Sequence, residues 1–183
     1  MPRRLRRLVV LALTGAALVA LTGCAAAQTT PSPLPTTDAS ETPLFASDEE
    51  ALAAAVEAYE AYLAVSDSIT ADGGTNSARI RHVTTPDFAE FSEIDFAAFQ
   101  DAGLRTDGRS AVDSARLAES SAGYVAFYAC QDVSDVKLLN AADEDVTPAD
   151  REARTALLIK AVSLGDEDLL IDGNEVWSGE NFC

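Results

Sequence analysis

The sequence is poor in the residues that bind metals, haem and nucleic acids. Its 183 residues include one His, one Trp and three Cys, and aromatic residues make up 7%. This leaves little material for His-based zinc sites, haem ligation or base-stacking platforms. Basic residues number 13 against 30 acidic ones, a formal charge of −17, and an acidic surface repels phosphate backbones. We therefore expect no metal site, no cofactor and no nucleic-acid partner.

Positive charge is concentrated at the N-terminus, where a short apolar run follows it. Four arginines precede the mainly apolar residues 8–21: Arg3, Arg4, Arg6 and Arg7. This pattern predicts a secretory signal peptide over residues 1–23. The run is shorter than the roughly 20 residues of a membrane-spanning helix, so we expect a signal rather than a permanent transmembrane anchor. The paired arginines leave both Sec and twin-arginine export open.

The signal ends in Leu21-Thr22-Gly23-Cys24, which resembles the bacterial lipobox. The resemblance implies cleavage before Cys24 and transfer of a diacylglyceryl group to its thiol. Two acyl chains hold a protein stably at a membrane. We therefore expect a lipid anchor on the extracytoplasmic face of the cell membrane. The alternative is that Cys24 is an ordinary thiol after a conventional cleavage site.

Residues 24–46 have the composition of a flexible tether. They contain Pro31, Pro33, Pro35 and Pro43 among Thr, Ser and Ala, with few large apolar residues. Such a segment cannot bury enough surface to offset its ordering entropy. The length of the remaining chain suits one domain, so residues 47–183 are predicted to form a single folded unit.

Helical periodicity opens this unit. Ser47 and Glu50 form a capping box, and apolar residues including Leu52, Tyr59 and Leu63 recur on one helical face until residues 72–74. We expect Tyr59 and Tyr62 to lie in the core, although they could line a pocket.

Further helical segments are expected after residue 77. A short one is predicted over residues 78–83, with His82 as a surface or packing residue rather than a ligand or catalyst. Another begins at Pro86, capped by Thr85, and carries a face rich in Phe and Ile. Ser92 is predicted to cap a separate helix that runs to Gln100.

From residue 109 onward, apolar residues recur every second residue, as in a strand, rather than every 3.6 residues, as in a helix. Strands are predicted over residues 110–119, 124–133, 135–139, 152–164 and 168–176. Long strands with short returns indicate an antiparallel sheet, and therefore an α+β fold. Both faces of these strands are fairly apolar, so one face is expected to meet the helices and the other a second layer or a cavity.

Two cysteines remain after Cys24, and export would place both in an oxidising compartment. Cys130 and Cys183 are expected to form a disulfide that pins the C-terminal tail to the sheet. The alternatives are two free thiols or an intermolecular bridge.

The sequence has predicted helices followed by a strand-rich half, and it contains the segments 103–108 (GLRTDG), 128–134 (YACQDVS) and 175–179 (EVWSG) and a terminal Cys183. Together these features resemble a particular group of proteins. These are the small secreted lipoproteins of high-GC Gram-positive bacteria with an NTF2-like, or cystatin-like, domain. The resemblance covers residues 47–183. It implies an α+β cone, in which N-terminal helices pack on a curved antiparallel sheet, and it carries no fixed catalytic motif.

Two functional hypotheses follow. The first is a noncatalytic binding or interaction domain for a small apolar ligand or a protein partner. The alternative is a small cavity enzyme of the isomerase or hydratase type, because ketosteroid isomerase, an NTF2-like protein, uses Asp and Tyr side chains. The candidate catalytic residues in this sequence are Asp113, Tyr124 and Tyr128. No spacing in the sequence forces these three side chains together.

Overall fold

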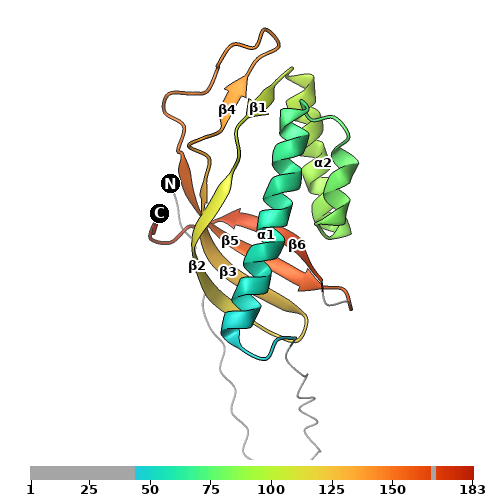
Figure 1. Cartoon of the computed structure of the whole chain (residues 1–183), viewed down its shortest axis with the longest axis vertical. Coiled ribbons are helices and arrows are strands. Elements are labelled where there is room, and N and C mark those ends of the chain that lie inside the picture. The colour runs from blue at the N-terminus through green and yellow to red at the C-terminus, as the bar shows by residue number, and fades with distance from the viewer. Residues whose placement is uncertain (1–43, 166–167) are drawn as a thin grey trace, which may run out of the picture. The chain divides into compact units, whose positions relative to one another are not determined.

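A computed structural model describes residues 44–165 and 168–183. The predicted signal peptide, Cys24 and most of the predicted tether lie outside the described residues. Within these residues, the elements follow the order of helices first and strands second, and together they form an α+β fold (Figure 1).

Helix α1 (Asp48–Ala71) begins at the predicted residue, since the Ser47 hydroxyl accepts a hydrogen bond from the Glu50 N–H. The Glu50 carboxylate accepts from the Ala46 N–H at 3.0 Å. Acidic residues fill the first turn, where they complement the positive end of the helix dipole. One face of α1 is buried, and it includes Tyr59 and Tyr62. The prediction that both tyrosines belong to the core is therefore confirmed.

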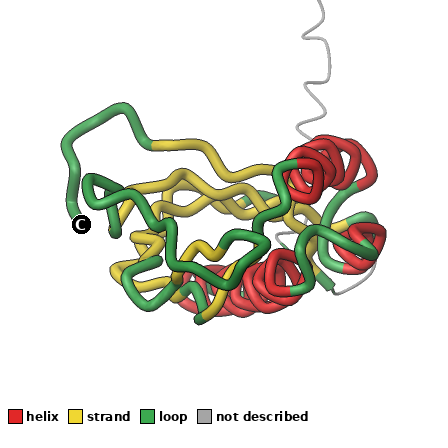
Figure 2. The backbone as a smooth tube through the Cα atoms, turned by 90° about the horizontal axis from the view of Figure 1, so that it is seen from above, coloured by secondary structure: helices red, strands yellow, loops and turns green. Residues whose placement is uncertain are grey.

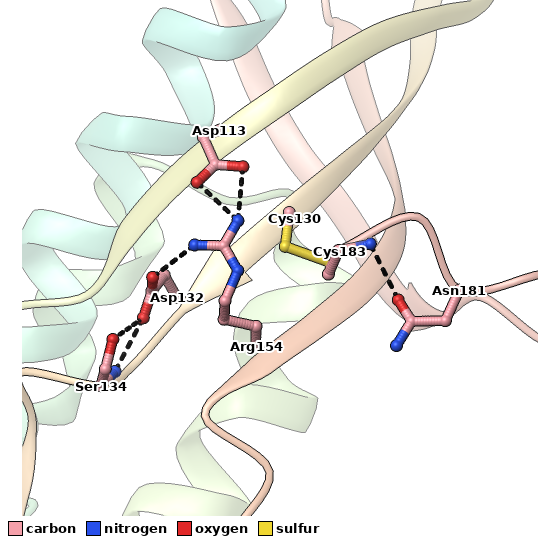
Figure 3. The surroundings of a disulfide bond; sticks show 7 residues. All are labelled: Asp113, Cys130, Asp132, Ser134, Arg154, Asn181 and Cys183. Carbon is pink, nitrogen blue, oxygen red and sulfur yellow. Dashed lines mark hydrogen bonds and ion pairs between the residues drawn. A yellow bond between two sulfur atoms is a disulfide. The ribbon is translucent and has the colours of Figure 1, made fainter.

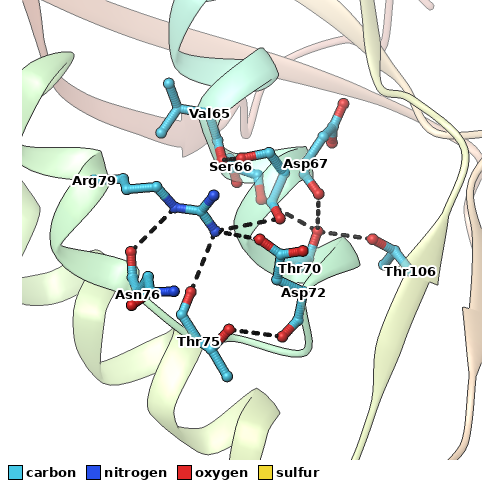
Figure 4. A network of polar contacts seen from close by, with 10 residues as sticks. Val65, Ser66, Asp67, Thr70, Asp72, Thr75, Asn76, Arg79 and Thr106 are labelled. Carbon is cyan, nitrogen blue, oxygen red and sulfur yellow. Dashed lines mark hydrogen bonds and ion pairs between the residues drawn. The ribbon is translucent and has the colours of Figure 1, made fainter.

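A polar network closes the C-terminal end of α1 (Figure 4). The Arg79 guanidinium donates to the Asp72 carboxylate at 2.7 Å and to the Asn76 carbonyl at 3.2 Å. The Thr70 and Thr106 hydroxyls lie 2.8 Å apart. Arg79 belongs to the short 3-10 helix η1 (Ser77–His82), so this network fixes the turn between α1 and η1 and ties both to the chain near residue 106.

Helix α2 (Pro86–Asp101) is one continuous helix, capped by Thr85 as predicted. The prediction that Ser92 starts a separate helix is wrong. The Ser92 hydroxyl donates to the Phe88 carbonyl at 2.8 Å, a bond to the preceding turn that a helix interior accommodates. On this helix Phe96 is buried, whereas Phe91 and Ile94 are exposed.

The main sheet contains four antiparallel strands in the order β2-β3-β5-β6. Their bounds are β2 (Ala111–Ser120), β3 (Tyr124–Asp132), β5 (Arg154–Ser163) and β6 (Leu169–Val176). Register shifts interrupt the β2–β3 and β5–β6 pairings, and such bulges increase local bend and twist. The result is a curved antiparallel sheet (Figure 1); the strand pattern predicts the antiparallel pairing, and the resemblance implies the curvature.

A separate two-stranded pair forms from β1 (Arg105–Asp107) and β4 (Lys137–Leu139). The sequence does not predict β1, and it places the start of β4 two residues too early. A three-residue strand is too short to show a period of two, so its position depends on the partner strand.

The core lies between α1 and one face of the sheet, which we call the inner face. Phe127, Ile159 and Ile171 are fully buried there against α1 residues. The rings of Tyr59 and Phe127 meet edge to face, with centroids 6.2 Å apart. The opposite face of the sheet is the outer face. Viewed from above, the C-terminus lies to the left of the strands, and helices lie to the right of and below them (Figure 2).

Candidate functional site

The outer face of the sheet carries polar and aromatic side chains. Along β3, Val125 and Phe127 point inward and are fully buried, whereas Tyr124 and Tyr128 alternate with them and are half-buried. This alternation follows from the two-residue period of a strand. The outer face is therefore the part of the sheet where side chains remain accessible to a ligand.

Residues 177–183, which we call the C-terminal strap, are fixed at both ends. At one end, the Trp177 N–H donates to the Ala156 carbonyl at 2.8 Å. At the other end, Cys183 forms the predicted disulfide with Cys130 of β3, and their Cα atoms lie 5.5 Å apart (Figure 3). The Cys130 side chain is fully buried. The strap consequently forms a fixed wall beside the outer face.

A groove of about 570 Å³ lies between the strap and the sheet. Its lining residues are Arg116, Tyr128, Trp177, Glu180, Asn181 and Phe182. Tyr128 is the central ring, with centroids 4.7 Å from Trp177 and 6.4 Å from Phe182 in edge-to-face arrangements. Ligand sites are concave and combine aromatic walls with a few polar groups, a description that this strap groove meets.

Two features hold the aromatic side chains in place. Arg116 lies directly opposite Tyr128 in the β2–β3 register, and its guanidinium carbon is 5.2 Å from the centroid of Phe182. Gly179 packs closely against the indole of Trp177, where an added methyl group would collide with the ring. The indole position thus depends on a glycine in the strap.

Arg116 differs from several other basic residues in the described part of the chain. Among the described residues, Arg116 forms no ion pair, whereas several other basic side chains do: Arg79, Arg81, Arg105, Arg154 and Lys160. The chain has a large excess of acidic residues. An arginine that remains without a carboxylate in an acidic protein is available to an anionic ligand.

A charge cluster borders the disulfide on the outer face (Figure 3). Arg154 donates to both carboxylate oxygens of Asp113, at 2.8 and 2.9 Å, and to Asp132 at 2.5 Å. Hydrogen bonds from Ser114 and then from Arg154 lower the pKa of Asp113. Hydrogen bonds from Ser134, with a smaller contribution from Arg154, lower the pKa of Asp132. Both carboxylates are therefore charged at neutral pH.

The three candidate catalytic residues all lie on the outer face, outside the core. Asp113 is held in the ion pair with Arg154. The ring of Tyr124 lies under the Lys160 ammonium at 5.3 Å, and a hydrogen bond with Glu119 raises the pKa of Tyr124. Tyr128 belongs to the strap groove. Each residue therefore has different partners, and the structure does not unite the three in one cavity.

The interior between α1 and the sheet contains a small polar network. The Tyr59 hydroxyl donates to the Gln131 Oε1 at 2.9 Å and accepts from the Asn174 Nδ2 at 3.2 Å. Burial raises the pKa of both Tyr59 and Tyr62. The buried polar residues in the described part of the chain are Thr84, Thr85 and Ser92. The described interior thus offers no carboxylate that could act as a base beside a tyrosine.

Sequence reasoning named Tyr128 and the disulfide, but it missed Arg116, Trp177 and Phe182 as members of one site. The expected disulfide could have indicated this site, because a C-terminal tail attached at Cys130 must pass over the outer-face residues next to Cys130. In residues 44–165 and 168–183 there is no helix long and apolar enough to cross a membrane. The same residues contain no cluster of side chains arranged to hold a metal.

No protein family, curated protein or solved structure shows a significant match to the chain. The fold and the groove nonetheless define a class of molecule. It is an acidic α+β domain with a disulfide-fixed aromatic groove on the outer face of its sheet.

Proposed function

We propose that this protein is a lipoprotein, anchored through Cys24 to the extracytoplasmic face of the cell membrane, that displays a noncatalytic binding domain. The signal-like N-terminus and its lipobox-like end support the anchor. The disulfide between Cys130 and Cys183 supports an oxidising location, where such bonds form and persist.

We further propose that the domain is an NTF2-like cone. A curved antiparallel sheet with a long helix packed on its inner face supports this assignment. Its interior is filled by large side chains, including Tyr59, Phe127 and Ile159. For this reason we place the binding site in the strap groove rather than inside the cone.

The observation that carries the binding proposal is the aromatic arrangement in the groove. Tyr128, Trp177 and Phe182 converge there from a strand and from the strap, and the disulfide fixes the strap. Aromatic side chains at accessible, pre-formed sites contribute strongly to binding small ligands and protein partners. No observation in the described residues favours the isomerase alternative, so we do not carry it further.

Membrane fractionation tests the anchor. The Cys24→Ser variant, expressed in a bacterium that processes lipoproteins, should leave the membrane fraction and appear in the medium. Thr22→Ser is a matched control that keeps Cys24 and should stay with the membrane. Membrane retention of the Cys24→Ser variant would refute the lipid anchor.

Native mass spectrometry tests the groove. Wild-type protein purified from its host should carry an additional small-molecule mass, and Trp177→Ala should lose it. Tyr124→Ala, also on the outer face but outside the groove, is the control and should retain the mass. If neither wild type nor control carries a mass that Trp177→Ala lacks, the groove does not bind a small molecule.

A further inference from the structure

We infer that the strap groove binds a small organic monocarboxylate with a flat apolar body. The carboxylate would pair with Arg116, and the apolar body would lie against Trp177 and Tyr128. This inference rests on the proposed binding function, since it names the ligand class for the same groove.

The position of Arg116 supplies the anion site. Its guanidinium packs at 5.2 Å from the Phe182 centroid and forms no ion pair among the residues that the structure describes. A guanidinium carries five N–H donors in a fixed planar arrangement. Those donors match the planar geometry of a carboxylate and can bind both of its oxygens.

The aromatic walls supply the apolar contact. The ring centroids of Trp177 and Tyr128 lie 4.7 Å apart, and Gly179 of the strap packs against the indole. The groove volume of about 570 Å³ lies in the range of small-molecule sites, roughly 300–1,000 Å³. A flat apolar body with one carboxylate makes use of both the rings and the cation.

Charge limits the ligand to a single negative group. Glu180 lines the same groove, and the whole chain has a formal charge of −17. One carboxylate is neutralised by the one guanidinium, whereas a second negative charge would face Glu180 and an acidic surface without compensation. Phosphate esters, which carry about two charges near neutral pH, are therefore expected to bind more weakly than monocarboxylates.

The only Trp in the chain is Trp177, so intrinsic fluorescence reports directly on the groove. Phenylacetate is titrated into the full-length, disulfide-bonded protein in detergent, and compared with phenylacetamide, phenethylamine and phenyl phosphate. We expect a saturable change with phenylacetate. Each of the other three should bind at least about tenfold more weakly, because the amide and the ammonium give up the charge-assisted hydrogen bond and the phosphate adds a second negative charge.

The Arg116→Gln variant should reduce phenylacetate affinity to the level of phenylacetamide and leave phenylacetamide binding unchanged. Arg109→Gln is the matched control, because Arg109 is also exposed and forms no ion pair among the described residues, but lies outside the groove. The control should bind phenylacetate as wild type does. If Arg116→Gln fails to fold, the comparison of phenylacetate with phenylacetamide on wild type decides the matter.

Equal affinity for phenylacetate and phenylacetamide, preference for phenethylamine or phenyl phosphate, or no fluorescence change with any compound would each overturn the inference. The proposed function fails separately. It would be refuted by membrane retention of the Cys24→Ser variant, or by native mass spectra in which neither the wild type nor the Tyr124→Ala control carries a mass that Trp177→Ala lacks. A host-derived mass lost in Trp177→Ala would uphold groove binding even if phenylacetate does not bind.

Discussion

Loss of the disulfide between Cys130 and Cys183 should destabilise the domain strongly. The bond closes a loop with a sequence separation of 53 residues. In the chain-entropy treatment, a cross-link of this span lowers the free energy of the folded state relative to the unfolded chain by about 4 kcal/mol. That is a large fraction of the roughly 5–15 kcal/mol that stabilises a typical protein.

The measurement is urea unfolding followed by circular dichroism on the wild type, on its reduced form and on Cys130→Ala/Cys183→Ala. Reduction removes only the cross-link, whereas the double variant also removes a sulfur that is fully buried at Cys130. We therefore expect a loss of about 4 kcal/mol on reduction and a somewhat larger loss in the variant. Trp177 emission should shift to the red in both, because the strap loses one of its two attachments.

Two results would contradict this reasoning. A loss below about 1 kcal/mol on reduction would show that the cross-link does not limit the unfolded chain as the loop model requires. An unchanged Trp177 emission after reduction would show that the strap stays in place without the disulfide, and that the groove does not depend on it.

Three further perturbations test other parts of the structure. Tyr59→Phe removes a buried hydroxyl and leaves two amide partners unsatisfied, so thermal unfolding should show a loss of about 1–3 kcal/mol. Gly74→Ala adds a side chain at φ 81°, where it meets the α2 backbone, and urea unfolding should show a free energy of unfolding lower by about 1–3 kcal/mol or more. The pKa values of Asp113 and Asp132 are lowered in the folded state, so their stabilising contribution is complete above about pH 4 and is lost as the pH falls through the folded values. The urea midpoint should therefore fall as the pH is lowered below about 4, and Arg154→Gln should reduce this fall in part, because hydrogen bonds from Ser114 and Ser134 are the larger causes of the two shifts; an unchanged fall in Arg154→Gln would exclude the ion pairs as a cause.

Local signals predicted much of the fold. The Ser47 and Thr85 caps mark the starts of α1 and α2 in the sequence, because capping depends on residues only three positions apart. The four long strands of the main sheet lie within two residues of their predicted bounds. The alternation of side chains along them indicates both the two-residue period of a strand and the two faces of the sheet.

Signals that depend on tertiary contacts were harder to read. The predicted break at Ser92 was wrong because a serine can either cap a helix or bond to the preceding turn within one, and the local sequence does not distinguish the two. Strand β1 has three residues and exists through its pairing with β4. The exposed Phe91 and Ile94 show likewise that an apolar helical face need not be buried along its whole length.

The candidate site combines residues whose proximity no local pattern reveals. Arg116 and Tyr128 meet through the register of two strands, and Phe182 joins them because Cys183 is tied to Cys130. The sequence predicted that the outer face would meet a second layer or a cavity. A seven-residue strap lies there instead, too short to cover a four-stranded sheet, and its edge leaves a groove beside the aromatic side chains. The predicted disulfide therefore has a consequence beyond stability, since the bond that attaches the tail also forms one wall of the site.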